Sequence, residues 1–209
     1  MNKILHKNFL FIALFIIWIL IACLLLLLYS DKEIFFFINQ KNNLFFDYVM
    51  TVLSAFGRGE SVAIIFLSLL IFKKFRNKIY IISTLSFGVI VPLLVYFSKL
   101  FFERVRPIGM YGEEIVHSVS WLSDLVNHSF PSGHSMGAFG LFLYLNHFTS
   151  SKNHLISIFY FAMALGCGYS RIYLGQHYFS DVLAGSIFGV MFGLFILWGI
   201  EFFYKKKQN

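Results

Sequence analysis

Two histidines and an aspartate carry the chemistry that this sequence suggests first. His177 and Asp181 are four residues apart, a spacing that places a carboxylate beside an imidazole on a helix. An aspartate held against one ring nitrogen fixes the tautomer and makes the other nitrogen a better nucleophile or base. His134 begins a further apolar run, and the ordinary pKa of histidine suits proton transfer. A metal ion shared by His177 and Asp181 is the competing interpretation.

Cations near these residues favour a phosphate ligand over a metal ion. Lys99 and Arg106 are seven residues apart, so two helical turns would place them on one face, and Pro107 would then end that helix. Together with Arg171, they would repel a metal ion and attract an anion. The alternative for Lys99 and Arg106 is a basic flank whose side chains snorkel to the membrane surface.

The segment Pro131–His134 would add backbone donors to such an anion site. Ser132 is a good helix N-cap, and Gly133 lets a ligand approach the backbone closely. Amide N–H groups and the positive end of the helix dipole would then face the anion, although a simple cap with an interfacial histidine is the alternative. Three clusters of polar residues together supply the positioned charge and the in-line groups that phosphoryl transfer needs. They are Lys99–Pro107, Pro131–His134 and Ser170–Asp181. Two histidines in these roles predict a bell-shaped pH profile.

The composition indicates that lipid surrounds the elements that must position these residues. Of the 209 residues, 58% are hydrophobic and 13% are charged, and the mean hydropathy is +0.75. Soluble chains have about 25% charged residues, so a soluble enzyme, a disulfide-stapled secreted domain and a disordered chain are all excluded. The net charge of +7 fits a membrane surface better than nucleic acid as a partner.

Charge-free apolar runs predict one all-α domain over residues 1–209, a polytopic membrane bundle of six transmembrane helices. The first run, Phe9–Tyr29, is long enough to cross a hydrocarbon layer of about 30 Å as a helix. The second expected helix needs residues 55–60 to form an outer turn that carries Arg58 and Glu60. Residues 33–48 are either a helix or hairpin in the interface or a plain loop. The expected helices cover roughly residues 8–29, 55–72, 79–99, 133–150, 154–171 and 179–203.

An even number of spans places both termini on one side of the membrane, and the distribution of basic residues identifies that side as the cytoplasm. Glu201 is the one acidic residue of the inner segments. These segments then hold most of the 17 basic residues, namely Lys3, Lys7, Lys73, Lys74, Arg76, Lys78, Lys152, Lys205, Lys206 and Lys207. The three polar clusters all lie at the outer ends of helices in this arrangement, where they can converge on one pocket.

The three clusters together resemble the signature of the type 2 phosphatidic acid phosphatase superfamily. Its patterns Lys-(six residues)-Arg-Pro, Pro-Ser-Gly-His and Ser-Arg-(five residues)-His-(three residues)-Asp occur in order at Lys99–Pro107, Pro131–His134 and Ser170–Asp181. The short chain is similar to the bacterial membrane branch, which includes phosphatidylglycerophosphate and undecaprenyl diphosphate phosphatases. The resemblance implies a helical bundle, a phosphohistidine intermediate, and no metal or other cofactor.

By motif position, the resemblance implies that His177 attacks phosphorus, that Asp181 orients it, and that His134 protonates the leaving group and then activates water. The phosphoryl oxygens would be held by Lys99, Arg106, Ser132, Gly133 and Arg171. The outer loop over residues 108–130 is where head-group selectivity is expected. Residues in or beside it that lie outside the signature are Glu103, Arg104, Glu113, Glu114, His117 and His128.

The sequence therefore predicts a metal-independent lipid phosphatase of the cytoplasmic membrane, with its active site facing the extracytoplasmic side. The expected partners are membrane lipids, and the substrate is undecaprenyl diphosphate, phosphatidylglycerophosphate or phosphatidic acid. A carrier that binds phosphorylated lipids without hydrolysing them is one alternative, and its histidines would be dispensable. A lipid phosphotransferase, in which an alcohol replaces water as the acceptor, is the other.

Overall fold

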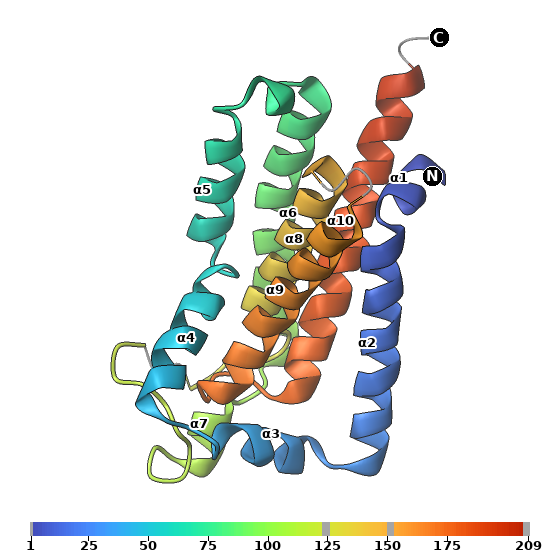
Figure 1. Ribbon diagram of the computed structural model, residues 1–209. Coiled ribbons are helices and arrows are strands. Elements are labelled where there is room, and N and C mark those ends of the chain that lie inside the picture. Colours follow the sequence, from blue (N-terminus) through green and yellow to red (C-terminus); the bar gives the residue numbers. More distant parts are fainter. Residues whose placement is uncertain (1, 123–125, 150–152, 207–209) are drawn as a thin grey trace.

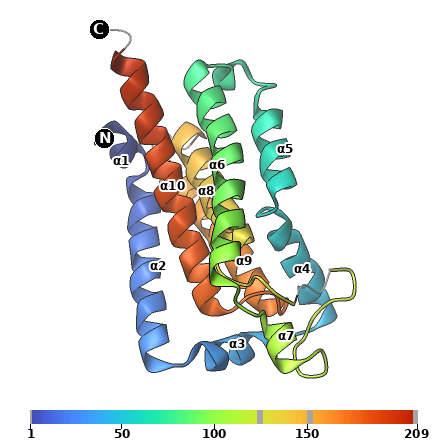
Figure 2. The same ribbon diagram turned by 180° about the vertical axis from the view of Figure 1, so that it is seen from behind.

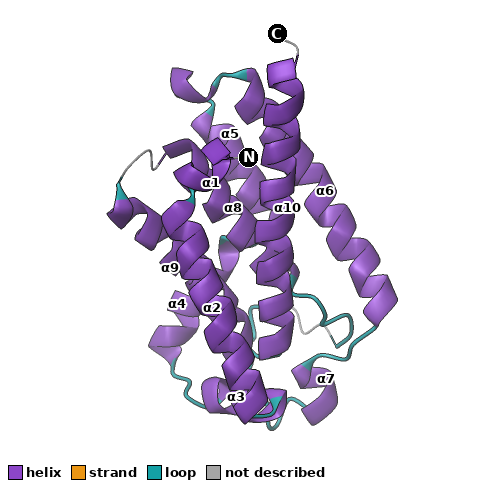
Figure 3. Cartoon of the chain, turned by 90° about the vertical axis from the view of Figure 1, so that its right-hand side faces the viewer, coloured by secondary structure: helices purple, strands orange, loops and turns teal. Residues whose placement is uncertain are grey.

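Every regular element of the described chain is a helix (Figures 1 and 3). The computed structural model describes residues 2–122, 126–149 and 153–206. The long helices are α2 (Phe9–Leu28), α6 (Lys78–Phe102), α8 (Gly133–Thr149), α9 (His154–Tyr173) and α10 (Phe179–Lys206). The short ones are α1 (Asn2–Lys7), α3 (Asp31–Asn39), α4 (Leu44–Ala55), α5 (Gly59–Leu69), α7 (Pro107–Tyr111) and a 3₁₀ turn (Lys73–Phe75). The predicted all-α class is confirmed.

In the described part of the chain, four segments are long and apolar enough to cross a membrane, and they contain α2, α6, α9 and α10. The pair α4 and α5, bent by 62°, is a fifth if it is counted as one span. The prediction of one helix over residues 55–72 is wrong. Helix α4 already begins at Leu44, the helix is interrupted over Phe56–Arg58, and α5 ends at Leu69. Each backbone N–H of residues 56–58 donates to a carbonyl three residues earlier, so the break leaves no N–H group of these residues unpaired.

Helix α8 lies at the centre of the bundle and packs mainly against α9 and α10. Its residues 135–144 are all buried. Glycines allow its neighbours to approach closely, since a Cβ on Gly137 would lie 2.7 Å from the carbonyl oxygen of Gly57 and one on Gly140 would overlap the ring of Phe87. The expected helix over 133–150 ends at Thr149, and residue 150 lies outside the described residues.

The outer faces of the bundle expose many large apolar side chains, which is typical of helices packed in lipid. Both termini lie at one end, and α3, α7 and the turn between α9 and α10 lie at the other (Figures 1 and 2). Residues 33–48 therefore contain a helix rather than a plain loop: α3 crosses this end of the bundle and α4 follows it. The side-chain amide of Asn39 at the end of α3 donates to the carbonyls of His117 and Tyr173, which ties α3 to α9.

Candidate active site

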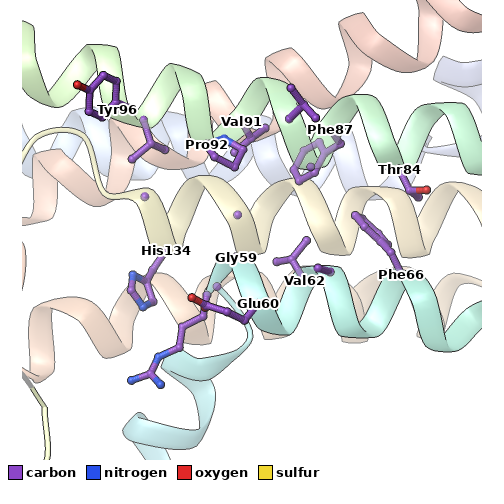
Figure 4. A pocket seen from close by; sticks show the side chains of 18 of the residues that line it. Gly59, Glu60, Val62, Phe66, Thr84, Phe87, Val91, Pro92, Tyr96 and His134 are labelled. Carbon is purple, nitrogen blue, oxygen red and sulfur yellow. The ribbon is translucent and has the colours of Figure 1, made fainter.

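Three regions of the chain bring the predicted site residues to one cavity of about 1080 Å³. The predicted residues that line it are Lys99, Arg106, Gly133, His134, Arg171 and His177. The other two, Ser132 and Asp181, are fully buried beside them. Figure 4 shows His134 and the start of α5 at one part of the cavity, and Phe66 and Thr84 further along it. The cavity thus has a polar end and an apolar end.

His177 lies in the turn before α10, where its backbone N–H donates to the carbonyl of Arg171 at 3.1 Å. Its Nδ1 atom is 3.6 Å from Asp181 Oδ2 and 3.4 Å from Ser129 Oγ. Ser129 in turn donates to the same Asp181 oxygen at 2.5 Å. Because Nδ1 faces the serine and the aspartate, Nε2 is the nitrogen left for a ligand in the cavity.

Asp181 is held by donors on both of its oxygens. Arg104 Nη1 pairs with Oδ1 at 2.6 Å, and the backbone N–H of Tyr178 donates to Oδ2 at 2.9 Å. A second guanidinium nitrogen of Arg104 pairs with Asp31 in α3 at 2.8 Å. Arg104 was predicted to lie near the head-group loop, but its guanidinium is occupied by these two carboxylates. It orients the aspartate that faces His177.

The ring of His177 is neutral at neutral pH. Burial is the main cause, because it disfavours the charged form and lowers the pKa of His177 well below its usual range. The positive charges of Arg106, Arg171 and Lys99 act in the same direction. A neutral imidazole whose Nδ1–H faces a carboxylate keeps a lone pair on Nε2, as a nucleophile requires.

The expectation that Lys99 and Arg106 share a helix face is wrong. Helix α6 ends at Phe102, Glu103 adopts a left-handed backbone with φ of 41°, and Pro107 begins α7 instead of ending α6. The chain therefore turns back, and the backbone N–H of Arg106 donates to the carbonyl of Val126 at 2.8 Å. Both cations still line the cavity, because the turn after α6 brings Arg106 back beside Lys99, and helical spacing plays no part.

Gln176 joins the two buried arginines of the site. Its side-chain oxygen accepts from Arg106 Nη1 at 3.1 Å and from Arg171 Nη2 at 3.5 Å. Arg171 also donates to Ser54 Oγ at 2.5 Å. Within the described part of the chain, Arg171 Nε and Gln176 Nε2 are buried without a hydrogen-bond partner, and both residues line the cavity. These are donors for which an anion in the cavity would be a partner.

The segment before α8 adopts the predicted N-cap. The backbone N–H of Ser135 donates to Ser132 Oγ at 3.3 Å, and α8 begins at Gly133. A Cβ on Gly133 would lie 3.1 Å from Val95, so there is little room for a larger residue. The start of α8, with His134 in its first turn, thereby faces the cavity, as an anion site at a helix N-terminus requires.

Four residues near the cavity were missed as site residues from the sequence. Ser129 and Gln176 stand next to or within signature segments, whereas Ser54 and Arg58 come from the α4–α5 region, which holds no signature residue. Arg58 had been placed in an outer turn, yet it lines the cavity beside His134. Only adjacency to the motifs could have indicated Ser129 and Gln176; no local signal indicates the other two.

A family model, curated relatives and a solved structure all place this chain among similar phosphatases. A family model described as the PAP2 superfamily matches residues 77–205. A lipid A 4'-phosphatase of Bacteroides thetaiotaomicron is 28% identical over 170 residues, covering 76% of this chain and 72% of the relative. An undecaprenyl-diphosphatase of Sulfolobus acidocaldarius is 32% identical over 163 residues, covering 76% and 73%. The crystal structure of a transmembrane PAP2-type phosphatidylglycerolphosphate phosphatase from Bacillus subtilis matches with a TM-score of 0.63 and 26% identity, covering 96% of this chain and 97% of that one.

Proposed function

The chain belongs to the PAP2 superfamily, and from this we propose that it is a metal-independent membrane phosphatase that removes the terminal phosphate of a lipid phosphate or diphosphate. The observation that carries the proposal is a cavity that joins His177, Lys99, Arg106 and Arg171 to an apolar groove. The relatives are named as phosphatases of lipid A, undecaprenyl diphosphate and phosphatidylglycerolphosphate, which supports the lipid class of substrate.

The apolar part of the cavity suits a hydrocarbon chain. It runs between α5 and α6, and the residues that line it there include Val62, Phe66, Val91, Pro92 and Val95. A lipid whose chain lies in this groove would present its phosphate to the polar end, where Lys99, Arg106 and Arg171 would hold the phosphoryl oxygens. The N-terminus of α8, with Ser132 and Gly133, would add backbone donors to this site.

The first chemical step transfers the phosphoryl group to His177. The Nε2 lone pair attacks phosphorus while the bond from phosphorus to the leaving oxygen breaks, and His134 donates a proton to that oxygen. Asp181 stabilises the positive charge that develops on the His177 ring, either directly or through Ser129 Oγ. The products of this step are a phosphohistidine and a leaving group with one new O–H bond, which is an alcohol from a monophosphate and a lipid monophosphate from a diphosphate.

The second step releases inorganic phosphate. His134, now neutral, takes a proton from water while the water oxygen attacks phosphorus, and the bond from phosphorus to His177 Nε2 breaks. His134 regains its proton and His177 its lone pair, so the enzyme returns to its starting state. An alcohol that replaced water in this step would make the enzyme a phosphotransferase, so solvent access to His134 decides between the two reactions.

The proposed topology has six spans with both termini in the cytoplasm. Four long spans and the bent pair α4–α5 account for five, and the central helix α8 is the sixth. The position of both termini at one end supports an even number of spans, and the basic residues of the inner segments support the cytoplasmic side. The cavity residues Lys99, Arg106 and His177 then lie toward the extracytoplasmic side.

Phosphate release by the full chain, purified in detergent, tests the function. Undecaprenyl diphosphate, phosphatidylglycerophosphate and phosphatidic acid would be supplied with EDTA present. We expect turnover of at least one lipid that survives chelation, and His177→Ala should lower it at least about a thousandfold. His154→Ala changes an exposed histidine at the other end of α9 and is the matched control, expected to retain activity. Binding of all three lipids without release would instead support the carrier.

A further inference from the structure

The break between α4 and α5 brings a charged residue to the cavity that the proposed mechanism does not use. Arg58 directly precedes α5 and lines the cavity, although it comes from a helix pair apolar enough to form a membrane span. A charge within a membrane span is costly, so such residues are rare and usually serve a ligand or an ion pair. The question is which partner Arg58 has.

Backbone packing fixes the position of Arg58 beside His134. A Cβ on the preceding residue, Gly57, would overlap the carbonyl oxygen of His134, and a Cβ on Gly137 would lie 2.7 Å from the carbonyl oxygen of Gly57. The break is therefore pressed against the first turn of α8. Arg58 follows Gly57 at this point and lines the same cavity as His134 and Arg171.

The guanidinium of Arg58 differs from the other arginine side chains of the protein. Arg76, Arg104, Arg106 and Arg171 each donate at least one hydrogen bond. Within residues 2–122, 126–149 and 153–206, Arg58 has no side-chain hydrogen bond, ion pair or ring contact; the residue is exposed and lines the cavity. Glu60 also lines the cavity but forms no ion pair with Arg58. The cavity therefore has a fourth, unpaired cation.

We infer that Arg58 binds a second phosphate on the leaving-group side, so that the enzyme prefers lipid diphosphates to lipid monophosphates. The inference rests on the proposed function, in which His134 protonates the leaving oxygen. In a diphosphate that oxygen belongs to the second phosphate, which must then lie close to His134, where Arg58 is. In a monophosphate the leaving oxygen is bonded to carbon, so no second phosphate is joined to it for Arg58 to bind. Arginine suits this role because its planar group binds two phosphate oxygens at once.

Two substrates with one hydrocarbon chain test this inference. Farnesyl diphosphate and farnesyl phosphate differ by one phosphate, so the ratio of their kcat/KM values measures the contribution of the second phosphate alone. We expect the purified wild-type chain to favour the diphosphate and Arg58→Gln to lower the ratio about tenfold or more, which is the range for a hydrogen bond to a charged group. Arg58→Lys should retain part of the preference, because it keeps the charge but loses the bidentate geometry.

A matched control is Arg76→Gln, which removes an arginine from the α5–α6 connection, outside the residues that line the cavity, and should leave the ratio unchanged. An unchanged ratio in Arg58→Gln would overturn the inference, and so would an equal loss on both substrates. The second result would mean that Arg58 holds the reacting phosphate or supports the fold.

Binding without turnover separates this inference from the proposed function. Methylenediphosphonate carries two phosphonates and cannot be hydrolysed, and methylphosphonate carries one. Calorimetry should show that wild type binds the first more tightly and that Arg58→Gln reduces this difference about tenfold. If wild type hydrolysed no lipid, the proposed function and the preference in turnover would fail together, yet the same loss of diphosphonate binding would still show that Arg58 binds the second phosphate. Equal binding of methylenediphosphonate by wild type and Arg58→Gln would overturn it.

Discussion

The two ends of the bundle each contain a buried histidine close to a carboxylate. His177 Nδ1 lies 3.6 Å from Asp181 Oδ2 at the end with α3 and α7, and His147 Nε2 lies 3.7 Å from Glu201 Oε1 at the end with the termini. Both histidines are almost fully buried, with exposures of 1% and 3%. Residue types and distance therefore do not distinguish a site from a structural contact.

The surroundings of the two pairs do distinguish them. His147 is bonded through Nδ1 to Asn8 at 3.0 Å, and Asn146 donates to the same asparagine at 2.9 Å, so neutral amides join α8 to the segment between α1 and α2. His177 instead lines a cavity together with Lys99, Arg106 and Arg171. The comparison indicates that open space and uncompensated positive charge make one pair fit for phosphate chemistry, whereas amide packing makes the other a clamp between helices.

The largest expected difference concerns the two carboxylates. Asp181→Asn removes the charge that stabilises the His177 ring as it becomes positive, so kcat should fall about 10²–10⁴-fold in the phosphate-release assay. Glu201→Gln should change kcat less than about twofold, because Glu201 lies at the other end of the bundle from the cavity. A similar loss in both variants would mean that the two pairs are coupled and that the comparison fails.

Loss of folding must be separated from loss of chemistry in Asp181→Asn. Asp181 also pairs with Arg104, which in turn pairs with Asp31, so the variant weakens a contact between α3 and α10. Thermal unfolding in detergent therefore accompanies the assay. A well-folded Asp181→Asn protein with near-normal kcat would contradict the role assigned to the dyad.

Local sequence patterns predicted the long helices and the three clusters, because apolar length and motif spacing are local properties. Helices expected at 8–29, 79–99 and 154–171 are found at Phe9–Leu28, Lys78–Phe102 and His154–Tyr173. Helix α4 was missed because residues 33–48 were expected to form an interfacial helix or hairpin or a plain loop, and this segment includes Asp47. In the folded chain its carboxylate is paired with His117 and Tyr173, and these partners are distant in sequence.

The contacts that complete the candidate site are likewise non-local. Ser129 bridges toward Asp181 across 52 residues, and Arg171 reaches Ser54 across 117 residues. No periodicity or spacing indicates such pairs. The position of Arg58 depends on how closely Gly57 packs on α8, which the sequence alone does not reveal. The catalytic roles of His134, His177 and Asp181 stay predictions, which phosphate release by variants tests.

A smaller effect is expected in the pH dependence of kcat/KM. His177 must be neutral to attack, and its lowered pKa keeps it neutral as the pH falls through the usual histidine range near 6.5. We expect kcat/KM to fall by less than about twofold between pH 7 and pH 5.5, whereas an unshifted histidine in the place of His177 would cost about tenfold. On the acid side, activity should fall only when the pH drops through the lowered pKa of His177.

Titration of the substrate phosphate would alter the same profile, so Lys99→Met serves as the comparison. It removes one of the cations that lower the pKa of His177, and the acid limb should therefore move to higher pH while the substrate titrates as before. The variant is expected to be slower at every pH, so the position of the limb is the quantity compared. A limb at the same pH in both proteins would show that His177 does not set it.

The smallest effects concern the hydroxyl and the amide that support the two pairs. Ser129→Ala removes the oxygen that contacts both His177 and Asp181, and the net value of such a hydrogen bond predicts a loss of about three- to tenfold in kcat with KM unchanged. Ser129→Thr keeps the hydroxyl and should restore part of kcat. Asn8→Ala should instead lower the free energy of unfolding by about 1–3 kcal/mol and leave kcat within about twofold, because its bonds join helix ends far from the cavity. If Ser129→Ala proved destabilising with normal kcat, Ser129 would be a clamp like Asn8, and Asp181 alone would orient His177.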